Sequence, residues 1–441
     1  VKMTVWDKKL NHDYCWVTLK LICNGSGCPE GNGFTISGNL STDQNQRVKN
    51  ADILLQSDIY TELFKSTVSD IEGQFEFKKV LGGLNYNLSA RKSGNYLEGV
   101  TTLDLVMIQQ HILGLSPFNS PYKTIAADAN NDLKVTASDL TELRKLILGI
   151  IPVLSKNASW RFPIVGQNLN IQYPFPFEEK LSVNELSTDL AAQNFKAVKI
   201  GDISGNASTD ITNPYTETRT EGALKIFIDE VAIRKGDILA IPLTSDNFMD
   251  VYGFQFTLNL KGGSFVGLQN GILDINENNI GVLNNDMVTF SYSSVSGVNA
   301  DKDDILFTIF VKAENVTDIT ELIAISSDIT KAEYYKGSEL KIGNVGLHLK
   351  SVPVTAIELF QNEPNPFRGQ TTVTFEMPHS AKATLSVHDV TGKIVAIRNI
   401  DAHKGINSEI FTKEQLGASG VLYYTLVSGE YTATKKMIIV E

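Results

Sequence analysis

Hydrophobic and polar residues alternate in short runs along most of the chain, a pattern that predicts β-strands with one buried face. In residues 34–92, for example, Phe75 and Phe77 are separated by a polar neighbour, and Gly- and Asp-containing turns divide the runs. In residues 222–350 the alternation extends over positions 252–260. Short strands at this spacing are typical of small β-sandwiches. We therefore expect a mainly β, multidomain fold built from β-sandwich modules.

One segment departs from this pattern and predicts two short helices. Within residues 93–151, DLVMIQQHILGL from Asp104 matches DLTELRKLILGI from Asp139, 35 positions later. Each copy is amphipathic and reaches a glycine, Gly114 or Gly149, the residue that best tolerates the left-handed conformation after a helix. The repeat predicts one small two-helix module among the β-sandwiches.

An oxygen-rich loop precedes the second helix and predicts a calcium site. Over residues 128–139, side chains with oxygen stand at loop positions 1, 3, 5, 9 and 12, and position 7 can offer its carbonyl. Calcium takes six to eight oxygen ligands, and three carboxylates this close repel one another unless a cation lies between them. The predicted ligands are Asp128, Asn130, Asp132, Lys134, Thr136 and Asp139. The alternative is a metal-free surface loop rich in Asn and Asp.

This loop-helix pattern resembles a type I dockerin, in which Asp at loop position 12 is normal. The first loop of the repeat departs from the pattern, because Leu97 stands where an oxygen is expected. Its weaker candidate ligands are Asn95, Gly99, Thr101 and Asp104. A fragment at 201–206 looks like the start of another such loop without a helix after it, and one hypothesis is that it lends oxygens to the first site.

Two further modules resemble known families through their order of hydrophobic segments. Residues 34–92 are similar to carboxypeptidase-regulatory-like modules, which implies a spacer role. Residues 222–350 follow the order of a cohesin, and cohesins are the usual receptors of dockerins. The resemblance implies docking within one chain or between neighbouring chains, the latter giving a homo-oligomer. Residues 152–221 are expected to be a connector whose aromatic residues, Trp160 among them, pack rather than bind sugar.

Residues 351–441 resemble the type A C-terminal sorting domain of the type IX secretion system of Bacteroidetes. The resemblance extends from a Pro-Asn-Pro-Phe entry to a Lys-Lys-Met ending. The expected sorting-signal residues are Pro364, Asn365, Pro366, Phe367, Lys435 and Lys436. The resemblance implies export through the type IX translocon and location at the cell surface.

The chain begins at Val1 without a signal peptide, so we expect the C-terminal part of a longer protein, with residues 1–33 ending a truncated β domain. Cys23 and Cys28 could form a disulfide, which leaves Cys15 to pair with an upstream partner. Three reduced thiols are the alternative.

Length, net charge and the motifs present in the sequence exclude several classes of function. A length of 441 residues suggests roughly three domains. The net charge of −11 argues against nucleic-acid binding, and no apolar run is long enough for a transmembrane span. Neither a Gly-x-Ser-x-Gly elbow nor a phosphate loop is present, so we expect no enzyme.

The favoured hypothesis is the non-enzymatic C-terminal region of a large secreted adhesin or appendage subunit, assembled through calcium-stabilised dockerin-like and cohesin-like modules. The alternatives are the non-catalytic tail of a secreted hydrolase and a scaffold that recruits dockerin-bearing proteins.

Overall fold

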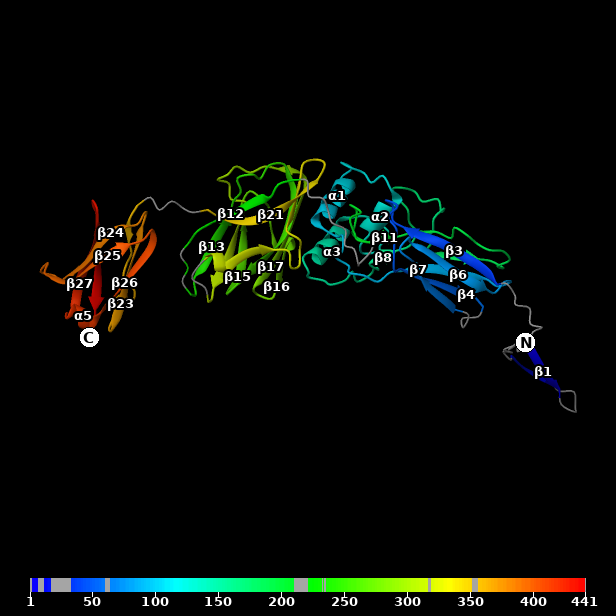
Figure 1. Ribbon diagram of the computed structural model, residues 1–441, viewed down its shortest axis with the longest axis horizontal. Helices are drawn as coiled ribbons and strands as arrows, with labels where there is room; N and C mark the ends of the chain where they lie inside the picture. Colours follow the sequence, from blue (N-terminus) through cyan, green and yellow to red (C-terminus); the bar gives the residue numbers. More distant parts are fainter. Residues whose placement is uncertain are drawn as a thin grey trace. The chain divides into compact units, whose positions relative to one another are not determined.

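The computed structural model describes residues 2–6, 12–16, 33–59, 64–209, 221–231, 233, 235–315, 319–350 and 356–440. Strands make up 45% of the chain and helices 10%, which confirms the expected mainly β, multidomain fold. The chain divides into two compact units, Val1–Ile147 with Ile151–Glu217 and Leu148–Ile150 with Thr218–Glu441 (Figure 1).

The chain starts with an antiparallel strand pair, β1 (Lys2–Trp6) and β2 (His12–Trp16), which includes the backbone of Cys15. The predicted pair Cys23 and Cys28 lies outside the described residues.

The first sandwich has two sheets, in the strand orders β10-β3-β6 and β5-β4-β7-β9. The strands are β3 (Phe34–Ser41), β4 (Asp52–Ser57), β5 (Phe64–Val68), β6 (Gln74–Val80), β7 (Tyr86–Arg91), β9 (Lys180–Val183) and β10 (Phe195–Lys196). Strand β6 shows the predicted alternation, with Phe75 and Phe77 buried between the sheets.

The segment expected to be a connector takes part in this sandwich. Strand β9 pairs antiparallel with β7, and β10 pairs parallel with β3. Trp160 and Phe162 are buried in the same core, in keeping with packing rather than an exposed sugar platform, although Tyr173 is exposed. Residues 152–209 are therefore structurally part of the first unit.

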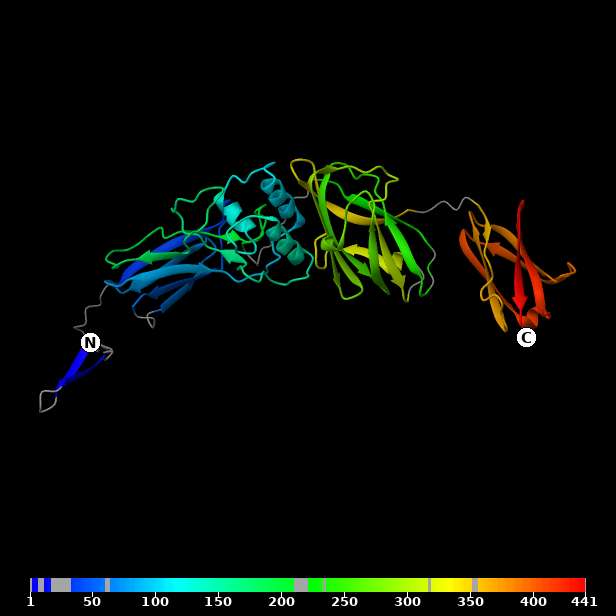
Figure 2. The ribbon, with the colours of Figure 1, turned by 180° about the vertical axis from the view of Figure 1, so that it is seen from behind.

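Three helices form a second core in this unit: α1 (Thr102–Ile112), α2 (Pro121–Ala127) and α3 (Ala137–Ile147). Helices α1 and α3 lie side by side in both ribbon views (Figures 1 and 2). Their buried residues Leu105 and Leu143 share a core with Ile200 and Ile203, which follow the short strand β11 (Val198–Lys199). Strand β11 pairs with β8 (Trp160–Arg161).

The second sandwich packs a seven-stranded sheet, in the order β12-β21-β20-β14-β17-β16 with β19 also on β14, against the sheet β13-β18-β15. Phe254, Phe256, Phe290 and Phe307 stack in its core. The elements are β12 (Leu224–Asp229), β13 (Ile238–Leu243), β14 (Val251–Leu260), β15 (Gly263–Asn270), η1 (Glu277–Asn279), β16 (Ile280–Leu283), β17 (Met287–Val298), β18 (Phe307–Ala313), α4 (Ile319–Leu322), β19 (Ile323–Ser326), β20 (Glu333–Lys336) and β21 (Lys341–Lys350).

The C-terminal sandwich has its own core and two sheets, β22-β23-β26 and β25-β24-β27-β28. Its elements are β22 (Glu358–Leu359), β23 (Gln370–Met377), β24 (Ala381–His388), β25 (Ile394–Ala402), β26 (Gly405–Thr412), α5 (Lys413–Leu416), β27 (Gly420–Ser428) and β28 (Tyr431–Ile439). Within the described ranges, no helix is long and apolar enough to cross a membrane.

Candidate functional site

The loop between α2 and α3 wraps its backbone around the carboxylate of Asp128, at loop position 1. The amides of Asp132 and Leu133 donate to Asp128 Oδ1 and Oδ2, each at 3.0 Å. Leu133 has a φ of 67°, in the left-handed region where calcium loops usually place glycine. The loop therefore makes its sharp turn at position 6 without a glycine.

Asp139, at position 12, closes the loop from the first turn of α3. Its Oδ1 accepts the amide of Asn130 at 3.1 Å, and its Oδ2 accepts the amide of Thr136 at 2.9 Å. Position 3 and position 9 are thus both tied to position 12. The sequence-predicted ligands Asp128, Asn130, Thr136 and Asp139 meet in one loop.

The electrostatics of the loop are unfavourable without a cation. Asp128 is 2% exposed and Asp139 is fully buried. Burial raises the pKa of Asp128 to about 6, and the charges of Asp139 and Asp132 raise it further against the opposing amide hydrogen bonds. Burial likewise raises the pKa of Asp139. Two buried carboxylates that repel one another favour a bound positive charge.

The available donors are all oxygens, which fits a hard cation such as calcium. Asp132 and Lys134 are exposed, and the Lys134 amide donates to Asp132 Oδ1 at 3.1 Å. In the described part of the chain, no three side chains of His, Cys, Asp or Glu are gathered into a metal-binding group. The donor set at Asp128 and Asp139 combines carboxylate, amide, hydroxyl and carbonyl oxygens instead.

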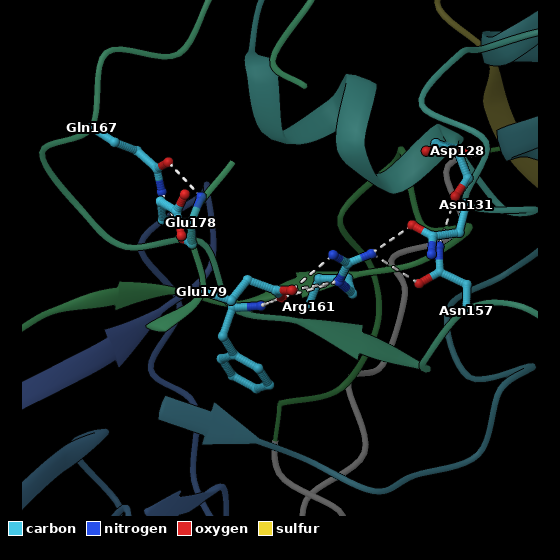
Figure 3. Close-up of polar contacts among 8 residues, drawn as sticks. Asp128, Asn131, Asn157, Arg161, Gln167, Glu178 and Glu179 are labelled. Atoms are coloured by element: carbon cyan, nitrogen blue, oxygen red, sulfur yellow. Dashed lines mark hydrogen bonds and ion pairs between the residues drawn. The ribbon is translucent and has the colours of Figure 1, made fainter. Parts of the chain in front are cut away.

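A polar brace that the sequence did not reveal holds this loop to strand β8 (Figure 3). Asn157 donates from Nδ2 to the carbonyl of Asp128 at 2.8 Å, and Arg161 donates from Nη1 to Asn131 Oδ1 at 2.9 Å. The same guanidinium donates from Nη2 to Glu179 Oε2 at 2.7 Å. No local motif marks Arg161 or Asn157, because their partners lie on other segments of the chain.

The first loop of the repeat is arranged differently from its sequence prediction. Asn95 is exposed, and its Oδ1 accepts the amide of Leu97 at 3.0 Å. Thr101 and Asp104 do lie together, since the Thr101 amide donates to Asp104 Oδ2 at 2.9 Å. Gly99, with a φ of 72°, lies against Ala207. The structure therefore brings Thr101 and Asp104 together, places Gly99 against Ala207, and bonds Asn95 locally to Leu97.

The Pro-Asn-Pro-Phe segment of the C-terminal sandwich is bonded to the last strand, β28. Asn365 Oδ1 accepts the amide of Ile438 at 2.8 Å, and its Nδ2 donates to the carbonyl of Lys436 at 3.1 Å. Phe367 is 2% exposed, and its amide donates to the carbonyl of Ile438 at 2.9 Å. Pro364 offers its carbonyl to the hydroxyl of Thr371 at 2.8 Å. The predicted sorting segment thus holds the C-terminal strand in place.

The other predicted sorting residues lie on or beside this strand. Lys435 and Lys436 belong to β28, and Lys436 is exposed. Pro366 lies between Asn365 and Phe367 in the clamped segment. A buried tyrosine that the sequence did not single out supports the segment: Tyr424 accepts the amide of Asn362 at 2.7 Å and donates to the carbonyl of Phe360 at 2.8 Å.

Comparison with protein families matches the helical region to the dockerin type I domain over residues 98–148. The chain contains a type I dockerin domain. Residues 364–440 of the same chain match the secretion system C-terminal sorting domain. The dockerin and sorting-domain assignments made from the sequence are confirmed, and the sorting domain indicates a secreted, cell-surface protein.

Several solved structures are similar to parts of this dockerin-containing chain. The seventh ScaB type I cohesin from Pseudobacteroides cellulosolvens is 11% identical, with 31% of this chain and 98% of that chain covered and a TM-score of 0.23. A type I cohesin–dockerin complex, Coh-OlpC-Doc435, from Clostridium thermocellum is 16% identical, with 31% and 99% covered and a TM-score of 0.24.

The structure of a pilin is similar over a larger part of the chain. BcpA, the major pilin subunit of Bacillus cereus, is 10% identical, with 92% of this chain and 97% of that chain covered and a TM-score of 0.23. At these values the similarities carry no functional conclusion. No curated protein matches the chain.

Proposed function

We propose that this chain is a non-enzymatic assembly region of a large secreted cell-surface adhesin or appendage subunit. Its dockerin domain binds calcium and docks onto a cohesin-like sandwich of the same chain or of a neighbouring copy. The observation that carries the proposal is a dockerin domain with a preformed, buried carboxylate loop in the same chain as a sorting domain.

Calcium would be held by the oxygens of the 128–139 loop. Asp128 and Asp139 supply buried carboxylates, Asn130 and Thr136 supply neutral side-chain oxygens, and Asp132 lies at the exposed side. The carbonyl of Lys134 stands at position 7. The ion would neutralise charges that burial leaves unfavourable, and it would fix the start of α3 relative to α2.

An apolar surface at the end of α1 supports docking to another protein surface. Ile112, Leu113 and Leu115 are 39%, 61% and 63% exposed, within four consecutive positions. Single exposed apolar residues are common on protein surfaces, but a group of large ones marks an interaction site more often. The group lies at the C-terminal end of α1, which closes at Ile112, and it flanks Gly114.

Light scattering of the full chain over a concentration series tests the proposal, with calcium and with a chelator. Docking between chains gives a mass that rises with concentration only in calcium, and docking within a chain gives a monomer that calcium makes more compact. Leu113→Glu with Leu115→Glu should abolish either response. Val390→Glu, at a 70% exposed position of the C-terminal sandwich, is the matched control. A molecular mass and a radius that are the same with calcium and with the chelator contradict the proposal.

A further inference from the structure

The residues that precede Gly99 in the first loop of the dockerin repeat do not provide the oxygen ligands expected at loop positions 1–6. A segment from much later in the chain occupies these positions instead. Thr101 and Asp104 correspond to Thr136 and Asp139 of the complete loop, 35 positions later. Before them Asn95 is exposed and bonded to Leu97. Residues 202–207 instead contact the Gly99–Asp104 stretch from nearly 100 positions downstream.

The downstream segment repeats the hydrogen bonds of loop positions 1, 5 and 6. Asp202 Oδ1 accepts the amide of Asn206 at 3.1 Å, and Asp202 Oδ2 accepts the amide of Ala207 at 2.9 Å. In the complete loop, Asp128 accepts the amides at positions 5 and 6 through the same two oxygens, each at 3.0 Å. Asp202 thus stands in the place of Asp128.

The two halves are joined through Asp104, at position 12. The amide of Ser204 donates to Asp104 Oδ1 at 2.9 Å, as the amide at position 3 of the complete loop donates to Asp139 Oδ1 at 3.1 Å. The amide of Thr101 donates to Asp104 Oδ2 at 2.9 Å, the same distance as its counterpart at position 9. The bond between positions 3 and 12 here spans 100 residues of sequence.

The halves meet in space between positions 6 and 7, where the chain is not continuous. A Cβ on Gly99 would lie 2.5 Å from the Cα of Ala207. Only glycine allows this approach at position 7, and its φ of 72° also favours glycine. Gly99 corresponds to Lys134 of the complete loop, and Val100 corresponds to Val135. The split loop therefore supplies all twelve positions.

From this arrangement we propose a second calcium site that is split between two distant segments. Its oxygens come from Asp202, Ser204 and Asn206 for the first half. The carbonyl of Gly99 and the side chains of Thr101 and Asp104 complete it. The inference rests on the calcium binding proposed for the dockerin domain. It extends that binding to a site that no continuous stretch of the sequence contains.

Position 5 of the split loop also carries a side-chain oxygen. Asn206 stands there, and its Oδ1 is buried. Position 5 of a calcium loop is a ligand position, filled by Asp132 in the complete loop. Asn206 therefore gives the split loop an oxygen donor at each position that carries one in the complete loop.

The charges of the split loop also favour a cation. Asp104 is fully buried, and the charge of Asp202 acts on it, so two carboxylates share this site. The nearby ammonium of Lys199 donates to the carbonyls of Tyr96 and Ile200, at 2.7 and 3.3 Å. The charge of Lys199 acts on both carboxylates, but its ammonium donates to backbone oxygens, whereas the carboxylates accept amide and hydroxyl donors.

Calcium titration calorimetry on the full chain, with four variants, tests the split site. We expect two ions per chain in the unaltered protein. Asp202→Asn with Asn206→Ala should bind one, Asp128→Ala with Asp132→Ala should bind one, and the combination should bind none. Asp246→Asn, an exposed aspartate of the second sandwich, is the charge-matched control and should bind two.

The outcomes separate the two proposals. Two ions retained in the Asp202→Asn, Asn206→Ala protein overturn the split site, and so does a single ion that the Asp128→Ala, Asp132→Ala change abolishes. No ion in the unaltered protein overturns calcium binding by the dockerin domain as a whole. Retention of the ion at 128–139 shows that the Asp202→Asn, Asn206→Ala protein is folded.

Hydrogen exchange gives a second readout. Calcium should slow exchange of the amides at 203–207 in the unaltered protein, because the ion links this segment to Asp104. The effect should be lost in the Asp202→Asn, Asn206→Ala protein while the 128–139 amides stay protected. Equal exchange at 203–207 with and without calcium overturns the split site.

Discussion

Removal of two carboxylates from the complete loop, Asp128→Ala with Asp132→Ala, should take away the stabilisation that one calcium ion gives. Asp128 is 2% exposed, and its pKa of about 6 lies roughly two units above its usual value of 3.8. Each unit corresponds to about 1.4 kcal/mol, so the metal-free loop carries a cost on the order of 3 kcal/mol at neutral pH. A bound cation relieves that cost.

Mass action leads to a similar magnitude. An ion that binds only the folded protein, present at a hundredfold excess over its Kd, adds about 2.7 kcal/mol to the free energy of unfolding. For a unit of this size, that corresponds to a rise in Tm of roughly 5–11 °C. The variant should lose this part of the calcium-dependent rise and keep only what the split site contributes.

Differential scanning calorimetry of the full chain measures the effect. Each protein is compared with itself in calcium and in chelator, so the amide hydrogen bonds lost with Asp128 cancel from the difference. The control is Asp246→Ala with Asp286→Ala, two exposed aspartates of the second sandwich. A calcium-dependent rise as large in the Asp128→Ala, Asp132→Ala protein as in the control would refute the reasoning.

Other predictions concern the brace, the sorting domain and export. Arg161→Met should weaken calcium binding several-fold without changing the number of ions, since it removes the contact to Asn131 and the ion pair with Glu179; calorimetry would contradict this by finding an unchanged Kd. Phe367→Ala should lower the free energy of unfolding of the C-terminal sandwich by about 3–5 kcal/mol in urea melts, because it empties a buried site next to β28, and a loss below 1 kcal/mol would argue against it. Burial raises the pKa of Tyr424 to about 12, so its contribution to stability is complete below about pH 10 and is lost as the pH rises from 10 to 12; Tyr424→Phe should remove this step from denaturation measured against pH. Deletion of residues 351–441 should retain the protein in the periplasm, and normal surface display of the shortened chain would speak against export through this domain.

The sequence predicted those parts of the fold whose signal is local. Period-two alternation located strands such as β6, and the 35-residue repeat located α1 and α3, because each pattern lies within a dozen consecutive residues. Helix α2 was not predicted, since its seven residues show no clear helical period. Strands β9 and β10, with four and two residues, were too short to be distinguished from a connector.

For the candidate calcium site, too, the local features could be predicted from the sequence and the long-range contacts could not. All the predicted ligands of the 128–139 loop lie within one continuous stretch of the chain, so the donor types could be read directly from the sequence. The brace from Arg161 depends on partners 18 and 30 positions away and leaves no local signature. The first loop was harder still, because counting back from Asp104 along the chain leads to Asn95. The 201–206 fragment was only a hypothesis from the sequence, since nothing local links it to Asp104, and the fold places Ser204 of this fragment beside Asp104.

The complete loop and the split loop share one set of hydrogen bonds. Both have a carboxylate at position 1 that accepts the amides at positions 5 and 6, and a carboxylate at position 12 that accepts the amides at positions 3 and 9. No bond of this set depends on a covalent link between positions 6 and 7, so the split loop loses none of them. The chain discontinuity between positions 6 and 7 adds a requirement that the complete loop lacks. Ile200 and Ile203 must pack in the helical core so that Asp202 lies next to Asp104. Calcium at the split site would therefore stabilise the tertiary packing of the first unit, whereas calcium at 128–139 mainly orders its own loop.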